Sequence, residues 1–178
     1  MLNAHMEEYL PELAMIKTEE IVARDDGLAP EKVKAEALCS LSLNVAQAAT
    51  EFFKMRAKKP SKRTRGKILM NLLEVCKWAS AMLLFHGLDP VQQDEIQEFA
   101  KEYDPEFQND AVLCCLSMQG NISELADIVF ADRDIEESLS VDDEAELEQH
   151  IAELLAMSCI CASLLNCSFE DLLTGAFF

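Results

Sequence analysis

Apolar side chains recur every three or four residues along most of the chain, which is the spacing of one face of an α-helix. No segment shows the alternation of apolar and polar residues that is typical of a half-buried β-strand. We therefore expect an all-α fold in which the apolar stripes of four long helices close a four-helix-bundle core. Helices are predicted over about 5–25, 31–56, 61–86, 90–103, 106–131 and 142–166, with a last short helix capped by Ser168.

Proline and glycine mark the expected helix ends. The chain has only five glycines and five prolines. Gly87 follows the apolar stripe of the 61–86 segment and is expected to end that helix. Pro11 lies inside the first segment and is expected to kink it. The other prolines each precede a helical pattern, where proline is tolerated in the first turn.

The two halves of the chain resemble each other. Residues 44–49 match residues 121–126 at an offset of 77, and residues 71–74 match residues 150–153 at an offset of 79. Both halves run in the order long helix, polar loop, long helix and short acidic segment, which indicates an internal repeat. The predicted organisation is an N-terminal helical arm over 1–28, a first unit over 29–104 and an acidic second unit over 105–178, with the two units forming one compact pseudo-dimeric domain as the alternative to separate domains.

Charge is distributed unevenly between the halves. The chain has 33 acids, 15 Lys plus Arg and a net charge of −18, yet residues 1–87 sum to +2 and residues 88–178 to −20. Eight of the 15 basic residues fall between Lys54 and Lys67. Because so negative a surface repels phosphate backbones, broad nucleic-acid binding is not expected.

The seven cysteines and the lack of targeting segments favour a cytoplasmic protein. No two cysteines form a CxxC pair, and most lie in apolar helical patterns, so we expect small buried hydrophobic groups in a reducing compartment. Zinc binding is the weaker interpretation, because Cys159 and Cys161 point to different helix faces and the three histidines are scattered. The first residues carry Glu7 and Glu8 rather than a basic signal-peptide start, and no apolar run is long enough to predict a membrane helix.

The second half carries two segments that resemble known motifs. Residues 121–127 (NISELAD) resemble the first motif of MazG-like all-α nucleotide pyrophosphohydrolases, and residues 148–155 (EQHIAELL) resemble the second. Residues 166–172 resemble the closing segment of that family, which Gly87-Leu88-Asp89 matches more literally in the first half. The resemblance covers about residues 31–178 and implies hydrolysis of a (d)NTP to a (d)NMP and pyrophosphate with Mg²⁺, or Mn²⁺, as the cofactor.

The chemistry of that reaction explains the motifs. Mg²⁺ neutralises phosphate oxygens and prefers hard oxygen ligands. Two acids at i and i+3 lie on one helix face, so two antiparallel helices can present four carboxylates to a metal. This chain departs from that pattern, because the four family positions carry Asn121, Glu124, His150 and Glu153 in the second half, and Asn44, Gln47, Asn71 and Glu74 in the first.

The resemblance therefore implies a reduced site. Glu124, Glu153, Asn121 and Glu74 are the predicted metal ligands, with Glu124, Glu153 and His150 as catalytic residues. Lys54 and Arg56 are the predicted contacts to substrate phosphates, and Glu51 is the other acid near the first-half surface.

Three interpretations of these polar residues stay open. The second-half site survives as a weaker metal site, or both sites are inactive and the fold serves nucleotide or protein binding. In the third, the polar residues are hydrogen-bonded groups between packed helices. The basic patch correspondingly contacts phosphates, forms a solvated loop, or docks onto the acidic half of the same or another subunit.

Two functions follow from these alternatives. The first is nucleotide binding, with hydrolysis, by an enzyme that forms homo-oligomers as relatives in the resembled family do. The alternative is an inactive interaction protein whose acidic half binds a basic protein partner. Neither membrane nor nucleic acid is an expected partner.

Overall fold

A computed structural model of the chain describes residues 9–24, 30–56, 60–131 and 139–177. All regular secondary structure in these ranges is helical, which confirms the predicted all-α class. The helices are α1 (Tyr9–Arg24), α2 (Pro30–Met55), α3 (Lys62–Phe85), α4 (Gln93–Glu102), α5 (Pro105–Asn109), α6 (Ala111–Val129), α7 (Val141–Leu164) and α8 (Phe169–Thr174).

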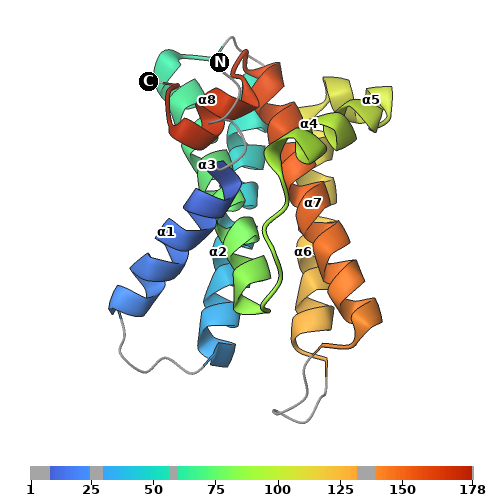
Figure 1. The fold of residues 1–178 in the computed structure, drawn as a ribbon. Coiled ribbons are helices and arrows are strands. Elements are labelled where there is room, and N and C mark those ends of the chain that lie inside the picture. Colours follow the sequence, from blue (N-terminus) through green and yellow to red (C-terminus); the bar gives the residue numbers. More distant parts are fainter. Residues whose placement is uncertain (1–8, 25–29, 57–59, 132–138, 178) are drawn as a thin grey trace, which may run out of the picture.

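Four long helices form a closed ring of contacts. α2 packs against α3 and α6, and α7 packs against the same two helices (Figure 1). α1 lies on the outer side of α3, and α4 lies on that of α7. Whether this ring represents two MazG-like units stays a prediction, since only the all-α class is established.

The core runs without interruption through the ring. Leu41 of α2, Leu72 of α3, Met118 of α6 and Leu154 of α7 all have no exposed surface and belong to one apolar cluster. Burial of such side chains is the main force that holds helices together in water. One apolar cluster therefore joins both predicted units.

The cysteines mostly follow the prediction. Six of the seven are buried, and Cys39 is exposed on α2. Burial raises the pKa of Cys76 to about 12, so its thiol stays protonated and packs as an apolar group.

One predicted helix is divided in two. The segment expected over 106–131 forms α5 and α6, because Asp110 adopts an extended conformation (φ −131°, ψ 96°) between them. Its carboxylate accepts the backbone N–H groups of Val112 and Leu113 and so caps α6. Helical spacing continues across Asp110, which is why periodicity alone misses this break.

Local signals explain the other helix ends. Gly87 has a φ of 75° directly after α3, as expected for a residue that ends a helix. Pro11 lies in the first turn of the described α1, where its missing N–H interrupts no helical hydrogen bond, so the expected kink is not required.

One helix meets the length and composition of a membrane span. Among the residues that the structure describes, Lys62–Phe85 alone does so, and 67% of its most apolar window is buried inside the protein. The expectation of no membrane partner and a cytoplasmic location stays a prediction.

Candidate functional site

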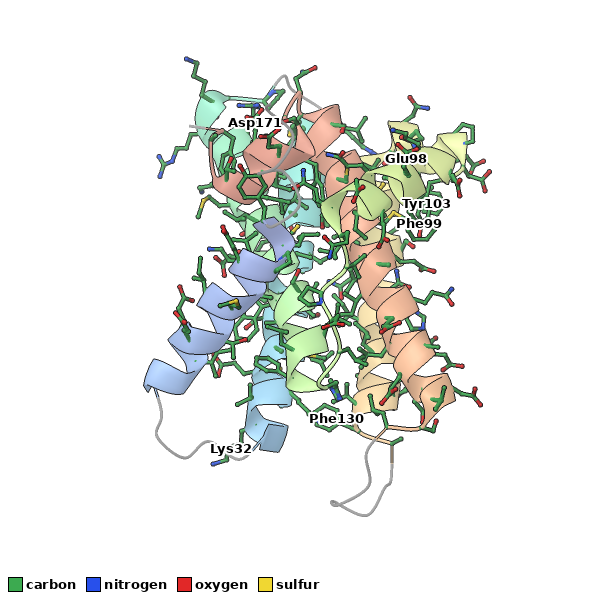
Figure 2. All side chains as sticks on the ribbon, in the orientation of Figure 1. Lys32, Glu98, Phe99, Tyr103, Phe130 and Asp171 are labelled. Carbon is green, nitrogen blue, oxygen red and sulfur yellow. The ribbon has the colours of Figure 1, made fainter. Side chains whose placement is uncertain are left out.

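The described residues enclose an open cavity of about 1210 Å³ between α2, α3 and the C-terminal segment with α8. Gln47 and Glu51 line it from α2, Asn71 from α3, and Asp171 and Phe177 from the C-terminal segment. Figure 2 shows Asp171 on α8, at the end of the molecule where α3 begins. Two first-half motif positions, Gln47 and Asn71, therefore face the same cavity.

Basic side chains surround the mouth of this cavity. Lys62, Arg63, Arg65 and Lys67 line it from the first turns of α3. Ser61 caps this helix by accepting the N–H of Thr64 at 3.0 Å, and no acid lies in the first turn. Since a helix N-terminus already carries partial positive charge, the cavity mouth attracts anions.

Arg65 shapes the cavity rather than standing free. Its guanidinium donates to the carbonyl oxygens of Leu165 (2.9 Å), Asn166 (3.2 Å) and Phe177 (3.5 Å). These bonds hold the end of α7 and the C-terminal segment against the start of α3. Lys62, Arg63 and Lys67 are the other basic residues of the cavity lining, and all three are exposed.

Glu51 partly balances this positive charge. Lys54 donates to its carboxylate at 2.9 Å. That hydrogen bond is the main cause that lowers the pKa of Glu51; burial opposes it, and the charges of Lys54 and Lys67 lower the pKa further. Lys54, a predicted phosphate contact, is thus paired with an acid at the cavity wall.

Arg56 binds a different acid. Its guanidinium donates to the carboxylate of Asp110, which joins the end of α2 to the start of α6. Burial raises the pKa of Asp110. The hydrogen bonds from Arg56 and from the backbone of α6 together lower the pKa by more than burial raises it, so the net shift is downward. The sequence singled out Lys54 and Arg56 of the basic patch as phosphate contacts, and the structure pairs both with acids, whereas Lys62, Arg63 and Lys67 of the same patch line the cavity.

Two predicted residues of the second unit meet each other. Nδ1 of His150 lies 3.2 Å from Oδ1 of Asn121, between α7 and α6. Asn121 is 7% exposed, and its amide nitrogen is buried with no partner among the described residues. This pair corresponds to the third interpretation of the sequence, in which the polar residues are hydrogen-bonded groups between packed helices.

Glu124 and Glu153 lie on either side of this pair. Glu124 follows Asn121 by three residues, and Glu153 follows His150 by three. Because α6 and α7 are antiparallel, the two glutamates are displaced from the pair in opposite directions, by about 4.5 Å along each helix. Glu124 is exposed, whereas Glu153 accepts from Gln149 at 3.1 Å. Burial raises the pKa of Tyr103, and the negative charge of Glu153 raises it further, which places Glu153 toward α4.

Glu74 is neutralised by lysines. Its carboxylate accepts from Lys77 at 2.9 Å and from Lys17 of α1 at 3.2 Å. Burial raises the pKa of Glu74, but these hydrogen bonds and charges outweigh it, so the pKa is lowered overall. Lys17 is 5% exposed and also lies 4.5 Å above the ring of Trp78.

The predicted ligands do not form one metal-binding group. In the part of the chain that the structure describes, no three His, Cys, Asp or Glu side chains gather so that they could hold a metal ion. Glu74 pairs with Lys77 and Lys17, and Glu153 lies toward α4. The magnesium or manganese site therefore stays a prediction of the sequence, as do the catalytic roles of Glu124, Glu153 and His150.

Comparisons with protein-family models, curated proteins and solved structures found no match to this chain. The arguments for function therefore rest on the residues and on the geometry of the site.

Proposed function

We propose that the cavity between α2, α3 and the C-terminal segment binds a nucleoside polyphosphate. The observation that carries the proposal is the composition of the cavity lining. It places free basic side chains at a helix N-terminus, next to amide and apolar groups. Phosphates match the first part and a flat heterocyclic base matches the second.

The phosphate end is assigned to the mouth of the cavity. Lys62, Arg63 and Lys67 lie in the first two turns of α3 and are exposed, and none of them makes an ion pair with the described residues. In a chain of net charge −18, such a local concentration of positive charge steers an anion to one place. Binding is therefore expected to weaken as salt rises.

The base end is assigned to the part of the cavity that Gln47 and Asn71 line. Gln47 and Asn71 each offer an amide that both donates and accepts, which suits the edge of a base. Met70 and Phe177 supply apolar surface for its face.

The test is a calorimetric titration of the full chain with a panel of (d)NTPs and the corresponding monophosphates at low salt. We expect triphosphates to bind at least tenfold more tightly than monophosphates. Lys62→Glu with Lys67→Glu is expected to abolish binding, whereas Lys32→Glu is not. Lys32 is also exposed and lies at the far end of α2, as Figure 2 shows. Equal losses in both variants, or no binding at 1 mM nucleotide, would contradict the proposal.

Hydrolysis to a monophosphate and pyrophosphate is the finer part of the proposal, and it is supported by the motif resemblance alone. Pyrophosphate release in the presence of Mg²⁺ or Mn²⁺ tests it. Glu124 and Glu153 do not line the cavity, so hydrolysis would need a separate second-half site between α6 and α7. We expect release to be lost in Glu124→Gln and Glu153→Gln, while nucleotide binding at the cavity is unchanged. If the wild-type protein binds nucleotide without turnover, the proposed binding function is retained and the proposed enzymatic function is excluded.

A second candidate is binding of a basic protein by the acidic half. Glu98, with a side chain 73% exposed, Asp142 and Glu148 are exposed acids of α4 and α7, and Lys101 is the one described base of residues 88–177. A lysine-rich peptide should then bind tightly at low salt and dissociate at about 0.3 M salt. Failure of such a peptide to bind at low salt would remove this candidate.

A further inference from the structure

The outer face formed by α2 and α6 has features that neither candidate function explains. These helices are antiparallel neighbours. Gln119 donates to the carbonyl of Ser42 at 2.9 Å, and the hydroxyl of Ser42 donates back to Gln119 at 3.1 Å. Arg56 and Asp110 join the same two helices at one end. We call the solvent-facing side of this pair the α2/α6 face.

The opposite side of the molecule is covered, and this face is not. α1 packs on α3, and α4 packs on α7, so the outer sides of those helices are shielded. In Figure 1, α2 and α6 lie behind α3 and α7, away from α1 and α4. Among the described helices, only the short α5 also reaches α6, at its start.

Large apolar side chains stand exposed on this face. Leu43 is 57% exposed and Phe53 65% exposed on α2, and Leu116 is 64% exposed on α6. Residues 37–50 and 111–123 contain no charged side chain, although the chain carries 48 charged residues. An exposed apolar surface without charge is typical of a protein–protein contact.

Gly120 lies in the same face of α6. A Cβ placed at this glycine would meet no atom within 4 Å, so nothing in the chain itself requires a glycine there. Glycine inside a helix lowers stability relative to alanine. A second molecule that packs closely on this face would explain the glycine at position 120, which packing within the chain does not.

We propose that the α2/α6 face binds the same face of a second copy of this chain through a two-fold axis parallel to the helices. In this arrangement α2 of each copy crosses over α6 of the other. Ser42 and Gln119 lie at the same height along the helix axes, because they are hydrogen-bonded to each other. Leu43 of one copy therefore fits over Gly120 of the other. Leu116 correspondingly lies close to the level of Ala46, which also lines the edge of the cavity, so a large and a small residue meet again across the contact.

The lack of charge makes this face the place where a second copy can pack. Two chains of net charge −18 repel each other, and they approach most readily where neither presents charge, as on this face. The charge-free stretches 37–50 and 111–123 are each about 20 Å long, and the helix pair is about 20 Å wide, so the contact covers about 400 Å² per copy. This is about half of the roughly 800 Å² per partner of a standard interface, so a weak dimer is expected.

Analytical ultracentrifugation of the full chain at 1–200 μM tests the proposal. We expect a reversible dimer that strengthens as NaCl rises from 20 to 500 mM, because salt screens the repulsion and the contact contains no charge pairs. A dimer that dissociates in high salt would indicate docking of the basic patch on the acidic half and would overturn the proposal, as would a monomer at every concentration and salt.

Matched variants locate the contact. Leu43→Glu with Leu116→Glu is expected to weaken dimerisation at least 100-fold, whereas Met15→Glu, at an equally exposed (57%) residue of α1, leaves it unchanged. Gly120→Phe is expected to block the dimer by filling the space under Leu43. Gly120→Ala is expected to raise the Tm of the monomer while weakening the dimer, a combination that a folding defect does not produce. Dimers of unchanged affinity in these variants would overturn the proposal.

Discussion

The helices α3 and α7 occupy equivalent places in the two predicted units, yet they begin in opposite electrostatic environments. Both are 24 residues long, and both have a serine N-cap. Ser140 of α7 forms a capping box with Asp143, and three acids fill the first turn. α3 starts with basic residues and has no acid there. The start of α7 is complete within the chain, whereas we propose that an anion from outside completes the start of α3.

The acids in the middle of the two helices differ in the same manner. Glu74 of α3 is bound by two lysines, one of them from α1. Its counterpart Glu153 of α7 accepts only the amide of Gln149 among the described residues. α1 therefore converts a motif acid of the first unit into part of the fold, and α4 lies over α7 without supplying such a partner.

Replacement of Glu74 and Glu153 by glutamine should show the largest difference in stability between α3 and α7. Glu74→Gln is expected to lower the free energy of unfolding by about 2.5 kcal/mol, because Glu74 loses its charge-assisted bonds to Lys17 and Lys77, although buried Lys17 keeps its second partner, Glu20. Glu153→Gln should change it by less than about 0.5 kcal/mol. Urea denaturation at pH 7 measures both. Equal effects would mean that α1 does not distinguish the two units.

The pH dependence of the same pair sharpens the result. The folded pKa of Glu74 lies below its ordinary value of 4.5, so its stabilising contribution is present above that value and is lost as the pH falls through the folded pKa. The difference in stability between wild type and Glu74→Gln should shrink steadily when the pH is lowered from 6 to 3. A difference that stays constant would show that the carboxylate charge is not its cause.

Arg65 should have the next largest effect. Arg65→Ala is expected to cost about 2 kcal/mol, because the guanidinium joins three carbonyl oxygens at the ends of α7 and of the described chain. Hydrogen exchange of residues 166–177 should rise with it. Arg63→Ala is the matched control and should leave both quantities nearly unchanged, since no hydrogen bond or ion pair joins Arg63 to the described residues. Similar effects of both variants would remove the distinction between a structural and a ligand-directed arginine.

The two N-caps should show how far the helix starts are alike. Ser140→Ala and Ser61→Ala are each expected to cost about 1 kcal/mol, because each hydroxyl accepts a backbone N–H of the first turn. Thermal unfolding measures both. A large difference between the two losses of stability would mean that α3 and α7 differ in the strength of their N-caps rather than in the charge of their first turns.

Charge reversal in the first turns should give the smallest effects, of opposite sign. Lys62→Glu is expected to stabilise the protein by about 0.4 kcal/mol at low salt, and Asp142→Lys to destabilise it by a similar amount, because the helix dipole favours acids at this end. Both effects should vanish at about 0.5 M NaCl. If Lys62→Glu proves destabilising, the basic start of α3 has a structural purpose and the argument for a phosphate ligand weakens.

Sequence patterns predict local features better than contacts. Helical spacing locates every described helix except the break at Asp110, which depends on one side chain capping the helix that follows. The cluster of basic residues from Lys54 to Lys67 is visible in the sequence, but their division into partners and free groups is not. Arg56 meets Asp110 and Arg65 meets Leu165 only because distant segments are brought together.

The sequence by itself determined that the chain is helical and divided in charge, because periodicity and composition act residue by residue. Only the tertiary structure decided which polar residues meet. Asn121 turns to His150, Glu74 turns to Lys17, and Gln47 and Asn71 line one cavity with Lys62. The physical reason is that such pairings depend on the register and orientation of packed helices, which side-chain burial across the whole core sets.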